Sequence, residues 1–411
     1  MKVSKALYLI VIAVSAIGCS SDNQSQDILP CIDVRKNYPE KEIILTDIAD
    51  VDYLCLNSDD DDFLYKGRIH CVTENTIVVI DDSSGSILFF SREGSPKSRF
   101  NRKGQGPEEY IDAISILVVY DEDADDVFVH QRSLFAISGN SILVYSSTGE
   151  FKRKITLPGG AAFPLIDFDD QSLFLYDMQN QQKKALRALK GTDFTSQSVD
   201  SSFYRISKTD GTVLEYVEFL CNEIDLTDFG IGNRVIHGYS RLVNSTAGLF
   251  LCNPESDTVF LYGKDKILTP IICKTPLVRN SNPRDILDDF LDTERYQFIR
   301  VQTLINSDDV LMKIPQDERY NRLNKNYIHD KQTNEIFRQK INLSDYKGKE
   351  FFITAQKTHL NGKEMLTHFE LDLYELKEAY EANKLSGKLK ELVATLDENK
   401  DNNVFMLVNF K

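Results

Sequence analysis

The sequence Ile87-Leu88-Phe89-Phe90-Ser91-Arg92-Glu93-Gly94 is repeated further along the chain as Ile142-Leu143-Val144-Tyr145-Ser146-Ser147-Thr148-Gly149. In each copy a run of β-forming residues leads into a polar turn that ends in glycine. Another apolar strand precedes each copy, at residues 76–80 and 127–129. Several strands in a unit of about 50 residues are typical of a β-propeller blade, because one blade cannot bury its faces alone and must stack on its neighbours.

Weaker copies of this pattern continue toward the C-terminus, at residues 173–176 with 203–211 and at 249–252 with 258–262. The chain has 411 residues, so blades of about 40–50 residues predict six to eight of them. Two stacked β-sandwiches are the alternative, but they do not require such similar strand pairs. WD40 blades are excluded because the sequence has no Trp. The last strand, residues 404–410, is expected to complete a blade begun by the other end of the chain and thereby to close the ring.

Two segments have apolar residues at helical spacing. Residues 283–300 carry Ile286, Leu287, Phe290, Leu291 and Phe298, and residues 371–396 show a similar pattern that breaks at Ser386-Gly387. Both are predicted to be amphipathic helices inserted between strands.

The N-terminus has the features of an export signal. Two lysines precede an apolar run of about a dozen residues, which is shorter than the roughly 20 residues that span a bilayer as a helix. The small residue Gly18 and then Cys19 follow, which resembles a bacterial lipobox and predicts a lipoprotein signal peptide at 1–18 with lipid attachment at Cys19. A plain secretory signal is the alternative. Residues 19–27 are predicted to be a flexible tether, and residues 28–411 are predicted to be the propeller. The protein is therefore expected to be an outer-membrane lipoprotein, and the sequence leaves open whether it faces the periplasm or the cell surface.

Charge and cysteine content narrow the classes of partner. The formal net charge is −15, which argues against nucleic acid and against a basic membrane-binding patch. Acyl chains on Cys19 are therefore expected to hold the protein at the membrane. Six further cysteines are Cys31, Cys55, Cys71, Cys221, Cys252 and Cys273. They are either buried apolar residues or members of a disulfide framework.

Three motifs resemble the six-bladed β-propeller lipoproteins of Bacteroidetes, which are similar to NHL-repeat propellers. Residues 43–56 resemble the opening strands of that family, and Gly104-Gln105-Gly106-Pro107-Glu108-Glu109-Tyr110 resembles its Gly-x-Gly-Pro-Gly-Glu-Tyr loop. The end, Asn402-Asn403-Val404-Phe405-Met406-Leu407, stands where the family has Asn-Pro-Val. Glu108 and Asn403 depart from these patterns. The resemblance implies six blades and a place in the cell envelope, and it carries no assigned activity.

The glycine-rich motif belongs to the first candidate site. Its residues are predicted to form either a ligand-binding loop or an inter-blade loop, and they are Arg99, Arg102, Lys103, Gly104, Gln105, Gly106, Pro107 and Tyr110. A phosphate-binding P-loop is excluded, because no Gly-Lys-Ser/Thr ends the motif and an apolar strand follows it. With Lys97, the basic side chains form a cluster that would suit a carboxylate ligand.

Metal-binding and catalytic patterns are weak. The acidic runs 59–62 and 121–126 are interpreted as solvated turns rather than Ca²⁺ loops, since the second lacks the glycine and final glutamate of an EF-hand. The histidines, His70, His130, His237, His329, His359 and His368, are scattered, with no His-Glu-x-x-His pair and no Gly-x-Ser-x-Gly elbow. We therefore predict no cofactor, metal or catalytic residue.

Two functions follow from these observations. The first is a non-enzymatic binding or scaffold module for a protein, a peptide or a glycan, although the lack of Trp disfavours glycan. The alternative is an enzyme, a metal-assisted lyase or hydrolase whose site lies in the central channel and is built from histidines and carboxylates of different blades. Convergence of two or three histidines on one point would favour the enzyme.

Overall fold

The computed structural model describes residues 29–411 except 57–60, 112–115, 132–140, 158–161, 178–196, 223–240, 305–312, 316–317, 319–322, 356–357, 362–363 and 399. The predicted signal peptide, Cys19, the tether and His237 lie outside the described residues. Within them, no helix is both long enough and apolar enough to cross a membrane.

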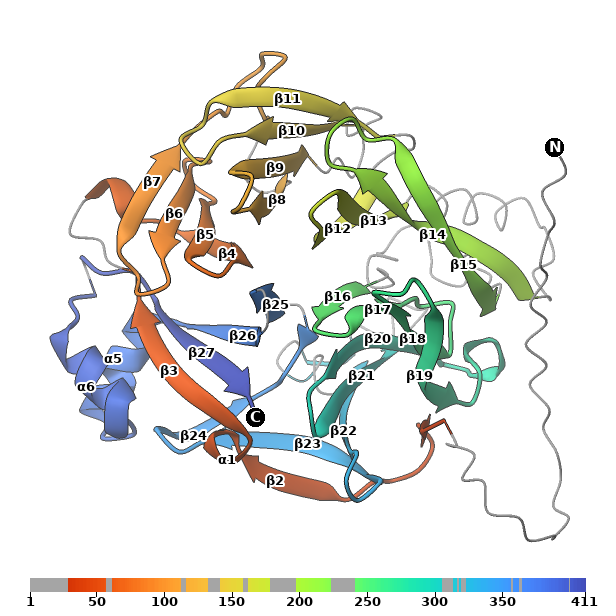
Figure 1. Cartoon of the computed structure of the whole chain (residues 1–411). Coiled ribbons are helices and arrows are strands. Elements are labelled where there is room, and N and C mark those ends of the chain that lie inside the picture. Colours follow the sequence, from red (N-terminus) through yellow and green to blue (C-terminus); the bar gives the residue numbers. More distant parts are fainter. Residues whose placement is uncertain are drawn as a thin grey trace, which may run out of the picture.

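Six sheets stand around a central axis and form a six-bladed β-propeller (Figure 1). We number the blades in chain order. Blade 1 contains β4 (Gly67–Val72), β5 (Thr76–Asp81), β6 (Ile87–Ser91) and β7 (Pro96–Phe100); blade 2 contains β8 (Ile116–Asp121), β9 (Asp126–Gln131), β10 (Ser141–Tyr145) and β11 (Phe151–Thr156). Blade 3 contains β12 (Ala162–Asp169), β13 (Ser172–Asp177), β14 (Gln197–Ser207) and β15 (Val213–Asn222).

The other three blades also use strands from the N-terminal segment. Blade 4 contains β16 (Arg241–Ser245), β17 (Gly248–Cys252), β18 (Thr258–Gly263), β19 (Leu268–Thr275) and β1 (Cys31–Asp33). Blade 5 contains β20 (Arg284–Asp292), β21 (Tyr296–Leu304), β22 (Asn324–Asp330), β23 (Glu335–Leu343), β24 (Tyr346–Phe351) and β2 (Glu40–Ile44). Blade 6 contains β25 (Thr358–Asn361), β26 (Glu364–Leu371), β27 (Val404–Phe410) and β3 (Ala49–Cys55).

The sequence repeat corresponds to the third strands of blades 1 and 2. Successive side chains of a strand point to opposite faces, and here both faces meet another blade. Ile87 and Phe89 pack against blade 2, whereas Leu88 and Phe90 pack against blade 6. The equivalent residues of β10 alternate in the same way between blades 3 and 1. Because both faces are buried, the strands are apolar throughout. Each large buried side chain stabilises the fold by about 2 kcal/mol.

The ring is closed by the two ends of the chain, as the sequence predicts. Strand β27 lies between β26 and β3, with Val404 opposite Cys55 and Phe410 opposite Ala49. An outer strand from the N-terminus thus completes the blade formed by the C-terminus (Figure 1).

The segment that precedes this closure, which we call the N-terminal belt (residues 31–55), runs along the outside of three blades. Its first strand, β1, is parallel to β19 of blade 4, and β2 is parallel to β23 of blade 5. A short helix, α1 (Leu45–Ile48), leads from β2 into β3. Ile32, Val34 and Ile43 of the belt are buried in the core that blades 4, 5 and 6 share.

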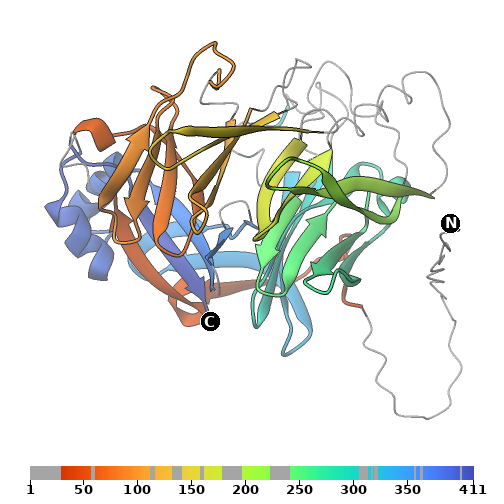
Figure 2. The ribbon, with the colours of Figure 1, turned by 45° about the horizontal axis from the view of Figure 1, so that its top comes forward.

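The predicted helical insertion at 371–396 is confirmed as two helices, α5 (Leu373–Glu381) and α6 (Gly387–Thr395). The side chain of Asp372 caps α5 by accepting a hydrogen bond from the Glu375 N–H at 3.0 Å. Both helices lie on the outer side of blade 6 (Figure 1 and Figure 2). Leu376 and Leu389 are among the residues that bury their apolar sides in the core.

The predicted helix at 283–300 is wrong. These residues form most of the hairpin of β20 and β21, the first two strands of blade 5. A β-bulge between Leu287 and Asp289 shifts the register, which contributes to the helix-like spacing of the apolar residues. Asp288 and Asp289, which resemble the polar face of a helix in the sequence, are each only 3% exposed.

Candidate functional site

The glycine-rich loop joins β7 of blade 1 to β8 of blade 2 and is folded onto itself. The Gly104 N–H donates to the Tyr110 carbonyl at 3.0 Å, and the Tyr110 N–H donates to the Arg102 carbonyl at 3.1 Å. The Tyr110 ring is completely buried, and its hydroxyl donates to the Gly85 carbonyl at 2.7 Å. Arg102 donates through Nε to the Gly149 carbonyl at 2.8 Å. The loop therefore fills the space between blades 1 and 2.

The remaining residues of this predicted site lie on the loop surface or on β7. Lys103 forms a parallel bridge with Tyr110, and Gln105 and Pro107 are exposed. The Gly106 N–H donates to the Glu109 carboxylate at 2.7 Å. Arg99 pairs with Asp62 at 2.5 Å. These contacts are all within the protein, and binding of a carboxylate ligand by this loop stays a prediction.

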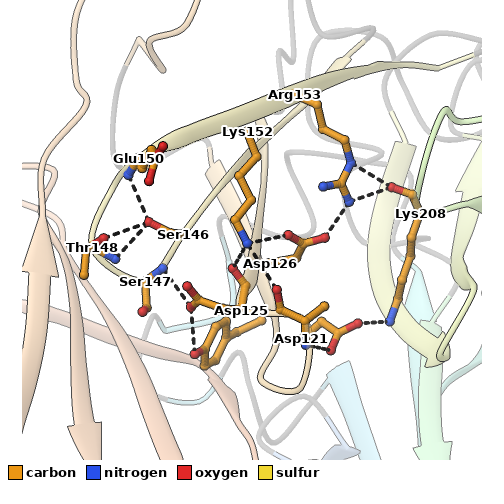
Figure 3. Close-up of polar contacts among 12 residues, drawn as sticks. Asp121, Asp125, Asp126, Ser146, Ser147, Thr148, Glu150, Lys152, Arg153 and Lys208 are labelled. Carbon is orange, nitrogen blue, oxygen red and sulfur yellow. Dashed lines mark hydrogen bonds and ion pairs between the residues drawn. The ribbon is translucent and has the colours of Figure 1, made fainter.

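The acidic run at 121–126 takes part in an ion-pair network between blades 2 and 3 (Figure 3). Asp126 contacts Lys152 at 2.9 Å and Arg153 at 2.5 Å. Asp121 contacts Lys208, which belongs to blade 3, at 2.5 Å. Residues 122–125 form a turn as predicted, but Asp126 is only 7% exposed, so the prediction of a solvated turn is wrong at this end of the run.

Lys208 is the centre of this network. Only 8% of its side chain is exposed, and its ammonium also lies 2.8 Å from Asp167 on β12. Burial raises the pKa of Asp167 to about 6, although Lys208 opposes the shift. Burial also acts on Asp126, but hydrogen bonds from Arg153 and Lys152 hold its pKa below the usual value. These contacts link blades 2 and 3, and each of the charged side chains named here is paired within the protein.

The described histidines belong to four different blades: His70 to β4, His130 to β9, His329 to β22 and His368 to β26. His329 is held between Gln297 at 2.8 Å and Asn334 at 2.9 Å. The side chain of His359 is outside the described part of the chain. Among the side chains that the structure describes, no three His, Cys, Asp or Glu residues are placed to share a metal ion. These four histidines therefore give the channel enzyme no support.

A cavity of about 470 Å³ lies between blades 5 and 6, beside helix α5. Strands β21, β24 and β26 and the start of α5 form its walls. The lining residues are Arg300, Tyr346, Lys349, Glu350, Phe351, Phe352, Thr354, Phe369, Glu370, Leu371, Asp372, Glu375 and Leu376. Its volume is in the range of small-molecule and side-chain binding sites.

One wall of the cavity is fixed by a buried ion pair. Arg300 is 9% exposed and contacts Asp288 at 2.5 Å and Asp289 at 3.6 Å. Asp289 also accepts a hydrogen bond from the Ala355 N–H at 3.1 Å. The two carboxylates more than neutralise the guanidinium, so this wall adds no net positive charge to the cavity.

The other walls combine aromatic rings with carboxylates. Phe351 and Phe369 meet edge to face with their ring centres 5.5 Å apart. Lys349 lies 5.8 Å from the ring centre of Tyr346 and pairs with Glu375 at 3.1 Å. Glu350, Glu370 and Asp372 complete the lining. An acidic cavity with aromatic walls is suited to a cationic side chain, because rings and carboxylates both attract a cation.

The sequence analysis did not find this cavity. Its walls come from an extra strand of blade 5, from β26 and from a helix, and no repeat links these three elements. One signal was present: two adjacent aspartates, Asp288 and Asp289, stand inside an apolar run that also contains Phe290. Aspartates buried in a strand require a partner, and Arg300 is the partner in the adjacent strand.

The architecture and the closed ring define a six-bladed β-propeller. The chain belongs to the family described as domain of unknown function DUF4934, which it matches over residues 29–409. No curated protein matches the sequence.

Among solved structures, the chain is similar to a Bacteroides fragilis protein described as exported, with 17% identity and a TM-score of 0.57 over 91% of this chain and 98% of that chain. It also matches virginiamycin B lyase from Staphylococcus aureus, with 11% identity and a TM-score of 0.35 over 78% of this chain and 81% of that one. BamB from Moraxella catarrhalis matches at 8% identity and a TM-score of 0.37, over 88% and 97% of the two chains. The first of these similarities shows a shared fold.

Proposed function

We propose that this protein is a non-enzymatic binding propeller of the cell envelope that captures a basic side chain of a protein or peptide in the cavity between blades 5 and 6. The cavity itself is the observation that carries the proposal. Its walls hold the carboxylates of Glu350, Glu370, Asp372 and Glu375 beside four aromatic rings. Both kinds of group favour a lysine or arginine over a neutral residue.

The wider setting is also part of the proposal. The chain is a lipoprotein of NHL-like propeller type, held at the outer membrane by acyl chains on Cys19. Support comes from the lipobox-like end of the leader and from the similarity to an exported Bacteroides protein. The net charge of −15 adds an attraction of longer range for basic partners, because an acidic surface attracts them over about a Debye length.

Calorimetric titration tests the cavity with two matched peptides, acetyl-Gly-Lys-Gly-amide and the same peptide with norleucine in place of lysine. We expect the lysine peptide to bind the mature protein with millimolar affinity, and the norleucine peptide to bind at least about tenfold more weakly, a difference of 1.4 kcal/mol. Equal affinity for the two peptides would overturn the proposal.

Variants separate the cavity from general attraction to an acidic protein. Glu350→Gln removes one charge from the cavity lining, and Phe352→Ala removes an aromatic wall without changing the charge. We expect each substitution to weaken the affinity for the lysine peptide at least about threefold. Glu150→Gln removes one exposed charge on distant blade 2 and should leave the affinity unchanged. The same loss in all three variants, or in none, would contradict binding in the cavity.

A further inference from the structure

Two cysteines face each other where the N-terminal belt begins. Cys31 is the first residue of β1, and its register partner in β19 of blade 4 is Cys273. Residues directly opposite in adjacent strands present their side chains on the same face of the sheet. The two thiols interact closely enough to shift the pKa of both. Neighbouring strands are about 4.8 Å apart, and disulfide-bonded cysteines have Cα atoms 4.4–6.8 Å apart.

The two thiols differ in reactivity in a way that suits disulfide exchange. Cys31 is exposed, whereas Cys273 is partly buried. Interaction with the Cys273 thiol lowers the pKa of Cys31, and the ammonium of Lys274 acts in the same direction against the effect of burial. The same interaction between the thiols, together with burial, raises the pKa of Cys273. Cys31 is thus the thiol that an external oxidant reaches first.

We propose that Cys31 and Cys273 form a disulfide bond that fastens the N-terminal belt to blade 4 when the protein meets an oxidising compartment. The oxidant is a protein or small-molecule disulfide. The Cys31 thiolate attacks it, forms a mixed disulfide and releases one oxidant thiolate. Cys273 then attacks the Cys31 sulfur and releases the second. Two electrons and the two thiol protons pass to the oxidant, which leaves as two thiols.

The bond would secure a weak point of the ring. Strand β1 has three residues and pairs with blade 4 on one side, and short edge strands separate easily from a sheet. A covalent bond at its first residue closes a loop that includes more than half of the chain, and long closed loops restrict the unfolded state most. The belt would then resist a pull applied through the residues that precede Cys31.

The other described cysteines behave differently and serve as internal references. Burial raises the pKa of Cys55 and of Cys71 to about 12. Cys55 donates to the Asn402 carbonyl at 3.3 Å, and Cys252 is buried. We therefore expect the pair Cys31–Cys273 to oxidise before these three.

The test uses the mature protein, folded in reduced form and then exposed to oxidised glutathione. Remaining thiols are alkylated, and the protein is digested without reductant and analysed by mass spectrometry. We expect a linked peptide that contains Cys31 and Cys273, with Cys55 and Cys71 alkylated only after unfolding. If Cys31 is detected only in the alkylated form, or linked only to glutathione, the proposal is overturned.

Thermal melting supplies a second readout. The oxidised protein should melt at least about 4 °C above the reduced protein, and Cys31→Ser should show no difference between the two conditions. Because Cys31 is exposed, this variant is expected to fold. Cys273→Ser is the reciprocal control, since it leaves Cys31 without its partner. A redox-dependent melt that persists in both variants would assign the effect to other cysteines and contradict the proposal.

Discussion

Lys208 of blade 3 lies 2.5 Å from Asp121 of blade 2 and 2.8 Å from Asp167 of its own blade. One nearly buried ammonium therefore pairs with two carboxylates at the junction of two blades, and Figure 3 shows its contact with Asp121. Removal of one member of a buried ion pair is costly, because the remaining charges lose their partner without gaining water.

Lys208→Met tests this junction. We expect the free energy of unfolding to fall by about 3 kcal/mol, since Asp121 and Asp167 are left close together without a cation. Lys154→Met removes an exposed lysine on β11 and should change the stability by less than about 0.5 kcal/mol. Urea denaturation measures both. Equal midpoints for the two variants would show that the network does not hold the blades together.

Asp167 gives this junction a pH dependence. Its pKa is raised from 3.8 to about 6 by burial, so the folded state binds the proton more tightly than the unfolded chain. This contribution stabilises the fold below about pH 4 and is lost as the pH rises through 6. The stability of Asp167→Asn relative to the wild type should therefore increase between pH 4 and pH 7. Lys208 lowers the pKa of Asp167, so in the Lys208→Met background the increase should move to higher pH. A difference in stability between Asp167→Asn and the wild type that stays constant from pH 4 to pH 7 would contradict the raised pKa of Asp167.

Tyr110 is expected to matter for stability through its hydroxyl. This group accepts from the Arg102 N–H at 3.0 Å and donates to the Gly85 carbonyl at 2.7 Å. Tyr110→Phe leaves both partners unsatisfied and should cost about 1–2 kcal/mol. Tyr216→Phe, at a ring that is 53% exposed, is the matched control. A similar small effect in both variants would mean that water replaces the lost hydroxyl.

Gly149 ends the turn of the second sequence repeat with a φ of +84°, and a Cβ atom there would lie 2.5 Å from the Cβ of Phe100 in blade 1. Gly348 has a φ of +81° with nothing within 4 Å of such an atom. Gly348→Ala should cost about 1 kcal/mol for conformation alone, and Gly149→Ala about 2 kcal/mol more for the clash. Chemical denaturation of the two variants separates these costs. Equal losses would show that the contact between blades relaxes freely.

The sequence predicts the parts of the fold that depend on local pattern. Ile87 and Ile142 occupy equivalent positions in the repeat, because both fill the space toward the following blade. The break at Ser386-Gly387 correctly separates two helices, with Ser386 at the N-cap position of the second. At 283–300 the local pattern fails, since a bulge and buried aspartates in a strand imitate the spacing of an amphipathic helix.

The cavity could not be predicted from such patterns. Arg300, Tyr346 and Phe369 come together only because β24 adds an extra strand to blade 5 and α5 covers the outer side of blade 6. The candidate loop around Gly104 joins two blades, and sequence alone does not reveal that Tyr110 and Arg102 use their polar groups inside the protein.

The N-terminal belt also sets the order in which the chain can mature. Residues 31–55 are synthesised before the three blades that they complete, and their partners lie in β19, β23 and β27. Strand β3 has no neighbour until residues 404–410 exist, so the earliest strand of the ring is among the last to be paired. A chain still bound to the ribosome therefore carries a long unpaired edge until its final residues are released. Rapid folding is not expected for contacts so distant in sequence.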